Sequence, residues 1–163
     1  MERNCLVFSD VHGSADAMRR IREAGRHFNS ERIISAGDLC PDPYDPLFFS
    51  IEGVRGNCDR YYEYGSLPFP PLLYTTVIYG RKVTVTHGHT PLDIPDDTDV
   101  LITGHTHIPF LGRKGNLYSL NPGSASLPRS SEGATFALFT PSALCLFSLD
   151  DFSEIRSLSF SSS

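Results

Sequence analysis

Residues 5–28 read CLVFSDVHGSADAMRRIREAGRHF, and residues 32–38 read RIISAGD. Each stretch contains a short apolar run that ends in small and acidic residues, which is typical of a buried strand. Between the two runs, apolar side chains recur at helical spacing from Ala15 to Phe28, with Ser14 as the candidate N-cap and Gly25 as the candidate end. A strand, a helix and a second strand in this order predict a parallel pair and an α/β fold.

The rest of the chain is rich in short apolar runs and poor in helical patterns. Three prolines within 41–53 leave room only for a short helix near Leu47–Ile51, and Thr90–Asp99 has no room for a helix. We therefore expect two β-sheets packed face to face, with few covering helices, in a single domain that spans 1–163. The Ser-rich end, 157–163, is expected to fray. Further strands are expected at Gly53–Arg55, Leu73–Tyr79, Lys82–Thr86, Val100–Thr103, Leu117–Leu120, Thr135–Thr140 and Ala143–Leu149.

The composition argues against several classes of protein. With 14 Lys and Arg against 19 Asp and Glu, the formal net charge is −5, and no basic run exceeds two residues. A long nucleic acid is therefore not an expected partner. No apolar run is long enough for a membrane span, and Cys5–Phe8 is too short for a secretion signal, so we expect a cytoplasmic protein. The cysteines lack Cys-x-x-Cys spacing, which favours reduced thiols over a zinc site or disulfides.

Histidines gather at the ends of the expected strands, where ligands bind in open α/β sheets. Five of the six histidines occupy such positions, and residues two apart point to the same side of an extended strand end. Imidazole, carboxylate and carboxamide groups suit Mn, Fe, Zn, Co or Ni. The chain offers more ligands than one ion needs, so we expect two divalent metal ions, the usual arrangement for phosphoryl hydrolysis. The candidate metal ligands are Asp10, His12, Asp38, Asn57, His87, His105 and His107.

Each part of this set also has an ordinary structural explanation. An Asp-x-His pair before a helix suits a cap and a loop, and the Gly-Asp and Gly-Asn pairs suit turns. Only His105 and His107 resist such an explanation, because two histidines at this spacing after an apolar strand rarely serve packing. The metal-site interpretation depends on the conjunction, since the ordinary explanation needs five independent coincidences in chain order.

The ordered set SDVHG, GD, RGNCD, THGH, GHTH and NPGS, between Ser9 and Ser124, resembles the calcineurin-like metallophosphoesterase superfamily, and within it the small YfcE-type phosphodiesterases. The resemblance implies a four-layer α/β/β/α sandwich of two mixed β-sheets. It also implies in-line attack on phosphorus by a hydroxide that bridges two metal ions. For the ligands it implies Asp10, His12, Asp38 and His107 at one ion, and Asp38, Asn57, His87 and His105 at the other, with Asp38 bridging.

Two features depart from the common pattern of the superfamily. Many members carry a histidine, thought to protonate the leaving group, where this chain has Cys58, although YfcE-type members often carry cysteine there. A thiol is a weaker hydrogen-bond donor, so we expect esters with acidic leaving groups to be preferred, unless Cys58 only packs. The helices that the family places after the GD motif and before the GHTH strand are short or missing, so we expect reduced helical layers.

Further residues are candidates for contacts with a substrate. His89 either orients the site or contacts phosphate, and is otherwise a loop histidine. Ser124, at the end of Asn-Pro-Gly-Ser after a strand, binds phosphate, braces the metal loops or belongs to a plain turn. Tyr61, Tyr62 and Tyr64 follow the RGNCD motif closely, and either stack on a nucleotide base or serve packing or a subunit contact.

These observations predict a metal-dependent phosphodiesterase that acts on a small phosphate ester. Two divalent ions, with Mn expected and Ni, Co, Fe or Zn left open, make the pocket locally positive, which favours phosphate. The alternatives are a phosphomonoesterase or protein phosphatase of the same fold, and a non-catalytic scaffold, which has no need of seven ligands. No membrane association is expected, and a homo-oligomer is left open. The expected catalytic residues are Asp38, Asn57, Cys58 and His89, and the expected substrate contacts are Asn57, Cys58, His89 and Ser124.

Overall fold

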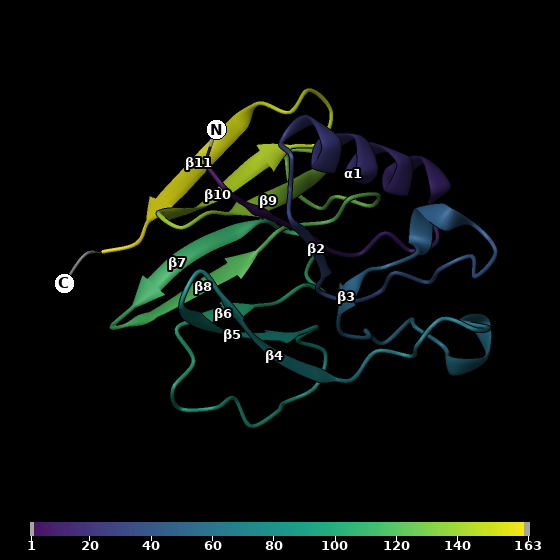
Figure 1. The fold of residues 1–163 in the computed structure, drawn as a ribbon, viewed down its shortest axis with the longest axis horizontal. Helices are drawn as coiled ribbons and strands as arrows, with labels where there is room; N and C mark the ends of the chain where they lie inside the picture. Colours follow the sequence, from purple (N-terminus) through teal and green to yellow (C-terminus); the bar gives the residue numbers. More distant parts are fainter. Residues whose placement is uncertain (1, 162–163) are drawn as a thin grey trace.

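The computed structural model describes residues 2–161, which form two β-sheets that pack face to face (Figure 1). The first sheet has six strands in the order β11-β10-β9-β1-β2-β3, and the second has five in the order β4-β5-β6-β8-β7. The strands of the first sheet are β1 (Cys5–Phe8), β2 (Arg32–Ser35), β3 (Glu52–Gly53), β9 (Thr135–Phe139), β10 (Ala143–Ser148) and β11 (Glu154–Ser159). Those of the second are β4 (Leu73–Ile78), β5 (Arg81–Thr86), β6 (Val100–Ile102), β7 (Phe110–Lys114) and β8 (Leu117–Asn121).

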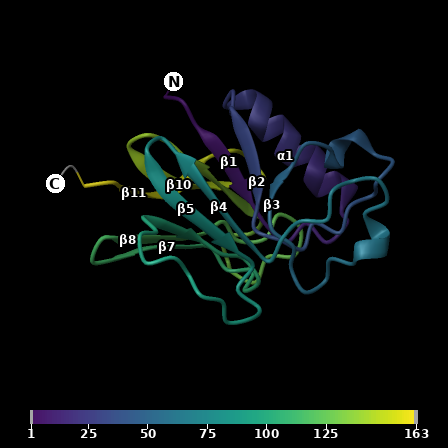
Figure 2. The same cartoon turned by 60° about the horizontal axis from the view of Figure 1, so that its bottom comes forward.

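Both sheets are mixed, as the sequence predicted. In the first sheet β1, β2 and β3 are parallel, and β9, β10 and β11 extend it in antiparallel fashion. In the second sheet β5, β6 and β8 are parallel, and β4 and β7 are antiparallel edge strands. Because parallel strands end at the same edge of a sheet, their following loops emerge together. Figure 2 shows the loops after β1, β2 and β3 at one end of the molecule, with both chain termini away from them.

The alternation of side chains along β1 divides the apolar core into two layers. Cys5 and Val7 point between the two sheets, and Leu6 and Phe8 point to the opposite face, beneath the helix. All four side chains are buried. A strand that is covered on both faces needs a continuous apolar run, which explains why CLVF does not alternate with polar residues.

The expected helix is α1 (Ala15–His27), which begins as predicted after Ser14, whose side chain caps the first turn. The expected end at Gly25 is wrong. Gly25 lies within the last turn and is buried against Ile33 of β2, and the helix continues to His27. Figure 1 shows α1 on the face of the first sheet that points away from the second sheet.

The helices are reduced further than a four-layer sandwich requires. Among residues 2–161, α1 is the only α-helix, and two 3-10 turns, Pro46–Phe48 and Tyr61–Glu63, are the other helical segments. No helix occurs in 90–99, as predicted, and none covers the outer face of the second sheet within the described chain. The observed layers of residues 2–161 are α/β/β. This confirms the predicted reduction of the helical layers, and the second helical layer of an α/β/β/α sandwich does not occur in this part of the chain. The longest helix of the described chain, α1, is too short and too polar to cross a membrane.

Two strands, β7 and β11, were not expected from the sequence. The prediction that 157–163 are frayed is wrong for Ser157–Ser159, which belong to β11 and pair with β10. Ile155 and Leu158 of this strand pack against the core between the sheets, so two apolar side chains fix a strand whose composition suggests disorder. Residues 162–163 lie outside the described residues.

Candidate metal centre

Five loops bring polar side chains together where the parallel strands end. These loops follow β1, β2, β3, β5 and β6. Backbone hydrogen bonds join them: the Asp10 N–H donates to the Gly37 carbonyl (3.0 Å), and the Gly104 N–H donates to the His87 carbonyl (3.1 Å). The predicted site residues on these loops are Asp10, His12, Asp38, Asn57, Cys58, His87, His89, His105 and His107.

The backbone is strained at five of these positions. A positive φ is uncommon outside glycine and costs about 1–3 kcal/mol per residue, and such residues cluster at active sites. The strain persists because neighbouring loops hold the backbone, for example through the 2.9 Å hydrogen bond from the His12 N–H to the Asp38 carbonyl. The strained residues, with their φ values, are Asp10 (57°), His12 (51°), Asp38 (55°), His105 (72°) and His107 (63°).

Two carboxylates and three imidazoles form a compact cluster. Asp10 Oδ1 lies 3.3 Å from His107 Nε2 and 3.5 Å from His12 Nε2. It also lies 3.7 Å from His87 Nε2. Asp38 Oδ2 lies 3.2 Å from His87 Nε2 and 3.7 Å from His12 Nε2. Two overlapping sets of donors result, Asp10–His12–His107 and Asp10–Asp38–His87, each with its donor atoms within 4.8 Å of one another. Overlapping sets of this kind are what two cations with shared carboxylates require.

Backbone carbonyls orient two of the imidazoles. His87 Nδ1 lies 2.7 Å from the Ala36 carbonyl oxygen, and His107 Nδ1 lies 2.7 Å from the Leu127 carbonyl oxygen. A carbonyl oxygen can only accept, so Nδ1 donates in both pairs. When the rings are neutral, Nε2 then presents its lone pair to the cluster, which is the usual arrangement of metal-binding histidines.

The centre of the cluster contains buried polar atoms without protein partners. Asp10 Oδ1 and His87 Nε2 are both buried and make no hydrogen bond within the described residues. Buried groups of this kind are costly unless an ion or a water satisfies them. Because the surrounding donors are carboxylates and imidazoles, the residues present fit divalent metal ions.

The outer carboxylate oxygens hold the two aspartates in place. Asp10 Oδ2 accepts hydrogen bonds from the Ser9 hydroxyl (2.6 Å) and from the His105 N–H (3.1 Å). Asp38 Oδ1 accepts a hydrogen bond from the Cys58 N–H (2.8 Å). Each carboxylate is therefore fixed through one oxygen and offers the other to the cluster.

The packing of the cluster also decides its ionisation. Burial opposes a charge on Asp38, but the adjacent His87 and the Cys58 N–H outweigh burial and lower the pKa of Asp38 to about 2. Burial likewise opposes a charge on His87, but Asp38 and the Ala36 carbonyl raise the pKa of His87 above its usual value. Asp38 is an anion at neutral pH, and a proton on His87 occupies the position that a cation would take. Acid therefore competes with metal binding.

Three predicted site residues lie at the rim of the cluster. Asn57 and His105 are exposed, and the ring centres of His105 and His87 are 5.1 Å apart. His89 is half-buried, with its ring centre 5.4 Å from that of His87. Its buried Nδ1 has no hydrogen-bond partner within the described residues. These three side chains surround the cluster on the side that is open to solvent.

Cys58 lies between the rim and the cluster. Its Sγ is within 4.8 Å of the donor atoms of His12 and Asp38, and it accepts a hydrogen bond of 3.6 Å from Asn57 Nδ2. Burial and the Asp38 charge raise the pKa of the Cys58 thiol, which keeps it protonated at neutral pH. The thiol is therefore placed as a weak proton donor beside the predicted metal ligands.

Ser124 braces the loops and does not reach a substrate. Its side chain is fully buried, and its hydroxyl donates to the Asp10 carbonyl (2.8 Å) and accepts from the Leu127 N–H (2.8 Å). The Leu127 carbonyl in turn orients His107. Because its hydroxyl is closed off from solvent and used by the backbone, the prediction that Ser124 contacts substrate is corrected to the bracing role that was its alternative.

Asp59 organises the site and was missed by sequence reasoning. Its buried carboxylate accepts hydrogen bonds of 2.8 Å from the backbone N–H groups of Asp38, Cys40 and Gly56, and one of 2.7 Å from the Tyr64 hydroxyl. Gly56 is required at this junction because a Cβ there would lie 2.1 Å from Asp38 Oδ1. Asp59 thus ties the loop after β2 to the loop after β3. The only signal in the sequence is the acidic residue that ends RGNCD.

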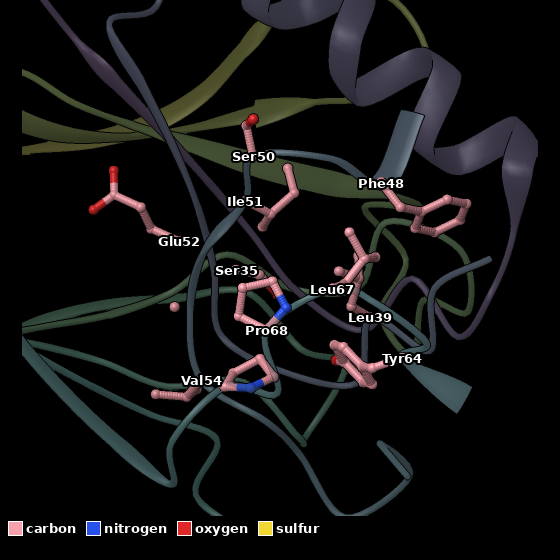
Figure 3. Close-up of a pocket in the computed structure, with 12 residues that line it drawn as sticks. Ser35, Leu39, Phe48, Ser50, Ile51, Glu52, Val54, Tyr64, Leu67 and Pro68 are labelled. Carbon is pink, nitrogen blue, oxygen red and sulfur yellow. The ribbon is translucent and has the colours of Figure 1, made fainter. Parts of the chain in front are cut away.

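A small apolar pocket lies behind this junction. Its volume is about 130 Å³, and Figure 3 shows Leu39, Phe48, Tyr64 and Leu67 among the side chains around it. Leu39 directly follows Asp38, and Tyr64 binds Asp59, so the pocket backs onto the metal loops. Its apolar lining distinguishes it from the cluster of carboxylates and imidazoles.

Comparison of the sequence with family models shows which superfamily the chain belongs to. The family model described as the calcineurin-like phosphoesterase superfamily domain matches residues 4–143. The chain belongs to this superfamily. It is 29% identical to phosphodiesterase YfcE of Escherichia coli K12, over 90% of this chain and 92% of YfcE. It is 33% identical to a probable metallophosphoesterase of Methanothermobacter thermautotrophicus, over 81% of this chain and 83% of that protein.

Solved structures of the superfamily agree with this assignment. The structure of E. coli YfcE, described as a phosphoesterase, matches with a TM-score of 0.84 at 25% identity and covers 97% of this chain and 100% of YfcE. Vacuolar protein sorting 29 from Cryptosporidium parvum has a TM-score of 0.71 at 21% identity, over 98% of each chain, and shows a shared fold only. The resemblance inferred from the motifs is confirmed, and the chain is a YfcE-like member of the superfamily.

Proposed function

We propose that this superfamily member is a phosphodiesterase that uses two divalent metal ions to hydrolyse small phosphodiesters. The observation that carries the proposal is the buried cluster, in which Asp10 Oδ1 and His87 Nε2 make no hydrogen bond within residues 2–161 and face further carboxylate and imidazole donors. Such a cluster is a liability in a stable fold unless cations bind there. The likeness to phosphodiesterase YfcE over nearly the full length of both chains supports the choice of reaction.

The proposed ligands divide into two groups that share Asp38. Its Oδ2 lies 3.7 Å from His12 Nε2 and 3.2 Å from His87 Nε2, so it is near one imidazole of each proposed group. Asn57 and His105 are exposed, and they would hold the second ion from the solvent side. The proposed ligands of the first ion are Asp10, His12, Asp38 and His107, and those of the second are Asp38, Asn57, His87 and His105.

The chain's own residues then shape the reaction. When bound, two divalent ions supply Lewis-acid stabilisation of the phosphate and activation of water. Asp38 stays anionic, and its neighbour His87 is held in one orientation by the Ala36 carbonyl. Burial lowers the pKa of His89, so His89 serves as a neutral hydrogen-bonding group at the open side. Cys58 is a weak donor there, and esters whose leaving groups depart without protonation are therefore the preferred substrates.

The ligand types favour particular metals, and the charge of the chain favours a small substrate. Carboxylate and imidazole ligands without a thiolate cluster favour Mn, and Ni, Co, Fe or Zn also suit them. A net charge of −5 and the absence of a basic stripe in the sequence favour a small ester over a nucleic-acid strand. We place the protein in the cytoplasm. The proposed catalytic residues are Asp38, Asn57, Cys58 and His89, of which the last three contact the substrate.

The test compares bis-p-nitrophenyl phosphate with p-nitrophenyl phosphate. The protein is stripped with a chelator and then supplied with Mn, Ni, Co, Zn or Fe in separate reactions. We expect metal-dependent cleavage that is faster for the diester and is lost in His87→Ala. His27→Ala is the matched control, because His27 is exposed on α1 and lies outside the site loops.

Other outcomes of this test discriminate among the alternatives. Faster cleavage of the monoester would favour a phosphomonoesterase on the same cluster. No cleavage of either ester by folded protein, with every metal supplied, would contradict the proposal and favour a non-catalytic scaffold. Equal loss of activity in His27→Ala and His87→Ala would indicate a general effect on folding, which circular dichroism of both variants would reveal.

A further inference from the structure

Two exposed aromatic side chains, Tyr61 and Tyr62, lie beside the metal loops together with the half-buried Phe69, and we call these three residues the aromatic platform. Tyr61 and Tyr62 are each 76% exposed, and they lie on the 3-10 turn that begins two residues after Asp59. Adjacent large aromatic side chains rarely stay open to water on a monomer surface unless they bind something. Packing within the chain, one of the explanations open at the level of sequence, therefore does not account for Tyr61 and Tyr62.

The platform is attached to the metal loops by a continuous series of contacts. The Phe69 ring lies edge-on to those of Tyr61 and Tyr64, with ring centres 5.6 Å and 5.1 Å apart. Tyr64 is buried and donates its hydroxyl to Asp59 (2.7 Å), which also accepts the Asp38 N–H (2.8 Å). The position of the platform is thus fixed relative to Asp38, the proposed bridging ligand.

Arg55 lies on the platform and belongs to the loop that carries Asn57. Its guanidinium lies over the Phe69 ring, 4.9 Å from the ring centre, and its Nη1 donates to the Pro70 carbonyl (2.8 Å). Among residues 2–161 it has no carboxylate partner, and its Nε and Nη2 make no hydrogen bond. An incompletely bonded guanidinium therefore lies over the platform, two residues before Asn57.

These groups match one kind of ester substituent. Exposed aromatic faces bind nucleobases by stacking, which tolerates any base because each has a flat π-face. A guanidinium with free N–H groups binds oxygen atoms of phosphate or sugar groups. Two exposed rings and one free cation suffice for a single nucleoside. They do not suffice for a strand, which would need a basic stripe that this acidic chain lacks.

We propose that the aromatic platform and Arg55 bind the ester group of the substrate that does not leave, and that this group carries a flat aromatic ring such as a nucleobase. The inference rests on the proposed phosphodiesterase function and specifies its substrate class as a small phosphodiester with one nucleoside or aryl substituent. Tyr61 and Tyr62 contact the ring. Arg55 contacts the oxygen atoms that join the ring to the reacting phosphorus.

The kinetic test uses two esters with the same leaving group, p-nitrophenolate, and different retained groups: thymidine 5′-(p-nitrophenyl phosphate) and methyl p-nitrophenyl phosphate. We expect Mn-loaded wild-type protein to hydrolyse the thymidine ester with a kcat/KM about tenfold higher, as stacking of one base allows. The double variant Tyr61→Ala/Tyr62→Ala should lose this preference and keep its activity on the methyl ester. Tyr61→Phe/Tyr62→Phe should retain the preference, because the ring faces remain.

A matched control and a second measurement complete the design. Phe49→Ala removes another exposed aromatic side chain, on a segment that packs against α1, and should leave the preference intact. Saturation-transfer NMR with thymidine 5′-monophosphate and zinc-loaded protein detects contact with the base without turnover. We expect saturation of the thymine protons with wild-type protein and its loss with Tyr61→Ala/Tyr62→Ala.

The outcomes separate this inference from the function on which it rests. Hydrolysis of the methyl ester with neither a preference for the thymidine ester nor saturation of thymine would overturn the inference and leave the proposed function standing. Failure to hydrolyse either ester would contradict the proposed function, and the NMR result would then decide the inference alone. A dimer that dissociates in Tyr61→Ala/Tyr62→Ala, with substrate preference unchanged, would identify the platform as a contact between copies and also overturn the inference.

Discussion

The buried cluster and the rim of this site differ in burial and in the way their side chains are fixed. The cluster is held by strained backbone, by carbonyls that orient imidazoles and by donors that fix each carboxylate. The rim has exposed or half-buried side chains with few hydrogen bonds. The cluster comprises Asp10, His12, Asp38, His87 and His107, and the rim comprises Asn57, Cys58, His89, His105, Arg55 and the aromatic platform.

This difference separates two tasks within one site. A metal centre needs donors fixed to within a few tenths of an ångström, which requires strain and dense support. Selection among substrates needs side chains that meet the ligand from solvent, and these can change with little effect on the fold. Substitutions in the cluster should therefore act on metal binding. Substitutions of the rim residues that are not proposed ligands, namely Cys58, His89, Arg55 and the aromatic platform, should act on the choice of ester. The following predictions test that division, from the largest expected effect to the smallest.

Asp10→Asn should have the largest effect. The amide keeps the shape of the side chain but removes the negative charge that Oδ1 directs at the cluster imidazoles. Loss of a group that merely supports a ligand costs about 10–100-fold in metal affinity, so loss of a ligand charge should exceed about 100-fold. Titration calorimetry with Mn measures the affinity, and the rise in Tm on adding Mn should disappear as well. Asp16→Asn, at an exposed position in the first turn of α1, is the control.

One result would remove Asp10 from the proposed ligands. If Asp10→Asn binds Mn as tightly as the wild-type protein, the carboxylate serves only to hold Ser9 and the His105 backbone. In the metal-free protein the substitution should not destabilise the fold, because Oδ1 makes no hydrogen bond that would be lost.

Asp59→Asn should weaken metal binding, although Asp59 is not one of the proposed metal ligands. An amide replaces one acceptor oxygen by an NH₂ group, which would face the backbone N–H groups of Asp38, Gly56 or Cys40. The loop that carries Asp38 should shift, and Mn affinity should fall by about 10–100-fold. Calorimetry at a temperature where the variant is fully folded measures this. A lower Tm with unchanged Mn affinity in the folded protein would show that Asp59 stabilises the fold alone.

Cys58→His should alter the range of substrates and spare the cluster. Imidazolium is a stronger acid than a thiol, and general acids contribute about 10²–10⁴-fold where a leaving group needs a proton. We expect a gain of about tenfold or more on phenyl and alkyl esters and little change on p-nitrophenyl esters. The measurement is the dependence of kcat/KM on the pKa of the leaving group, with Cys58→Ser as control. An unchanged dependence would show that Cys58 only packs, and a loss of Mn binding would place it in the cluster.

The residues of the cluster could be predicted from the sequence more fully than the residues that hold them in place. Each cluster residue lies in the loop that follows a short apolar strand, as Asp38 follows RIISAG and His87 follows VTVT. Parallel strands deliver such positions to one edge, so a local pattern together with topology was sufficient to gather them. The structure brings these residues together, and their role as ligands remains the proposal that Asp10→Asn tests.

The residues that hold the cluster in place could not be predicted, because their role depends on contacts between segments that are distant in the sequence. Asp59 acts through backbone N–H groups up to 21 residues away, and a backbone donor has no signature in a sequence. Ser124 looks like a phosphate-binding hydroxyl until its burial is known. Gly25 looks like a helix end, and the sequence does not show that it is buried against β2 within a helix that continues to His27. The Ser-rich β11 was missed for the same reason, because pairing with β10 outweighs its composition.

Tyr64→Phe should have the smallest effect, and it probes the junction between cluster and rim. The substitution removes the hydroxyl that donates to Asp59 Oδ1, and the ring keeps its edge-on contact with Phe69. The loss should stay near 1 kcal/mol in the free energy of unfolding, about fivefold in an equilibrium constant. It should stay that small because Oδ1 still accepts the Cys40 N–H, so no buried acceptor is left unsatisfied. Chemical denaturation measures the stability, and calorimetry should show a smaller fall in Mn affinity than Asp59→Asn causes. If Tyr64→Phe instead lowers Mn affinity as much as Asp59→Asn does, the hydroxyl positions the metal loops. The positions of the cluster residues and of the rim residues would then depend on each other.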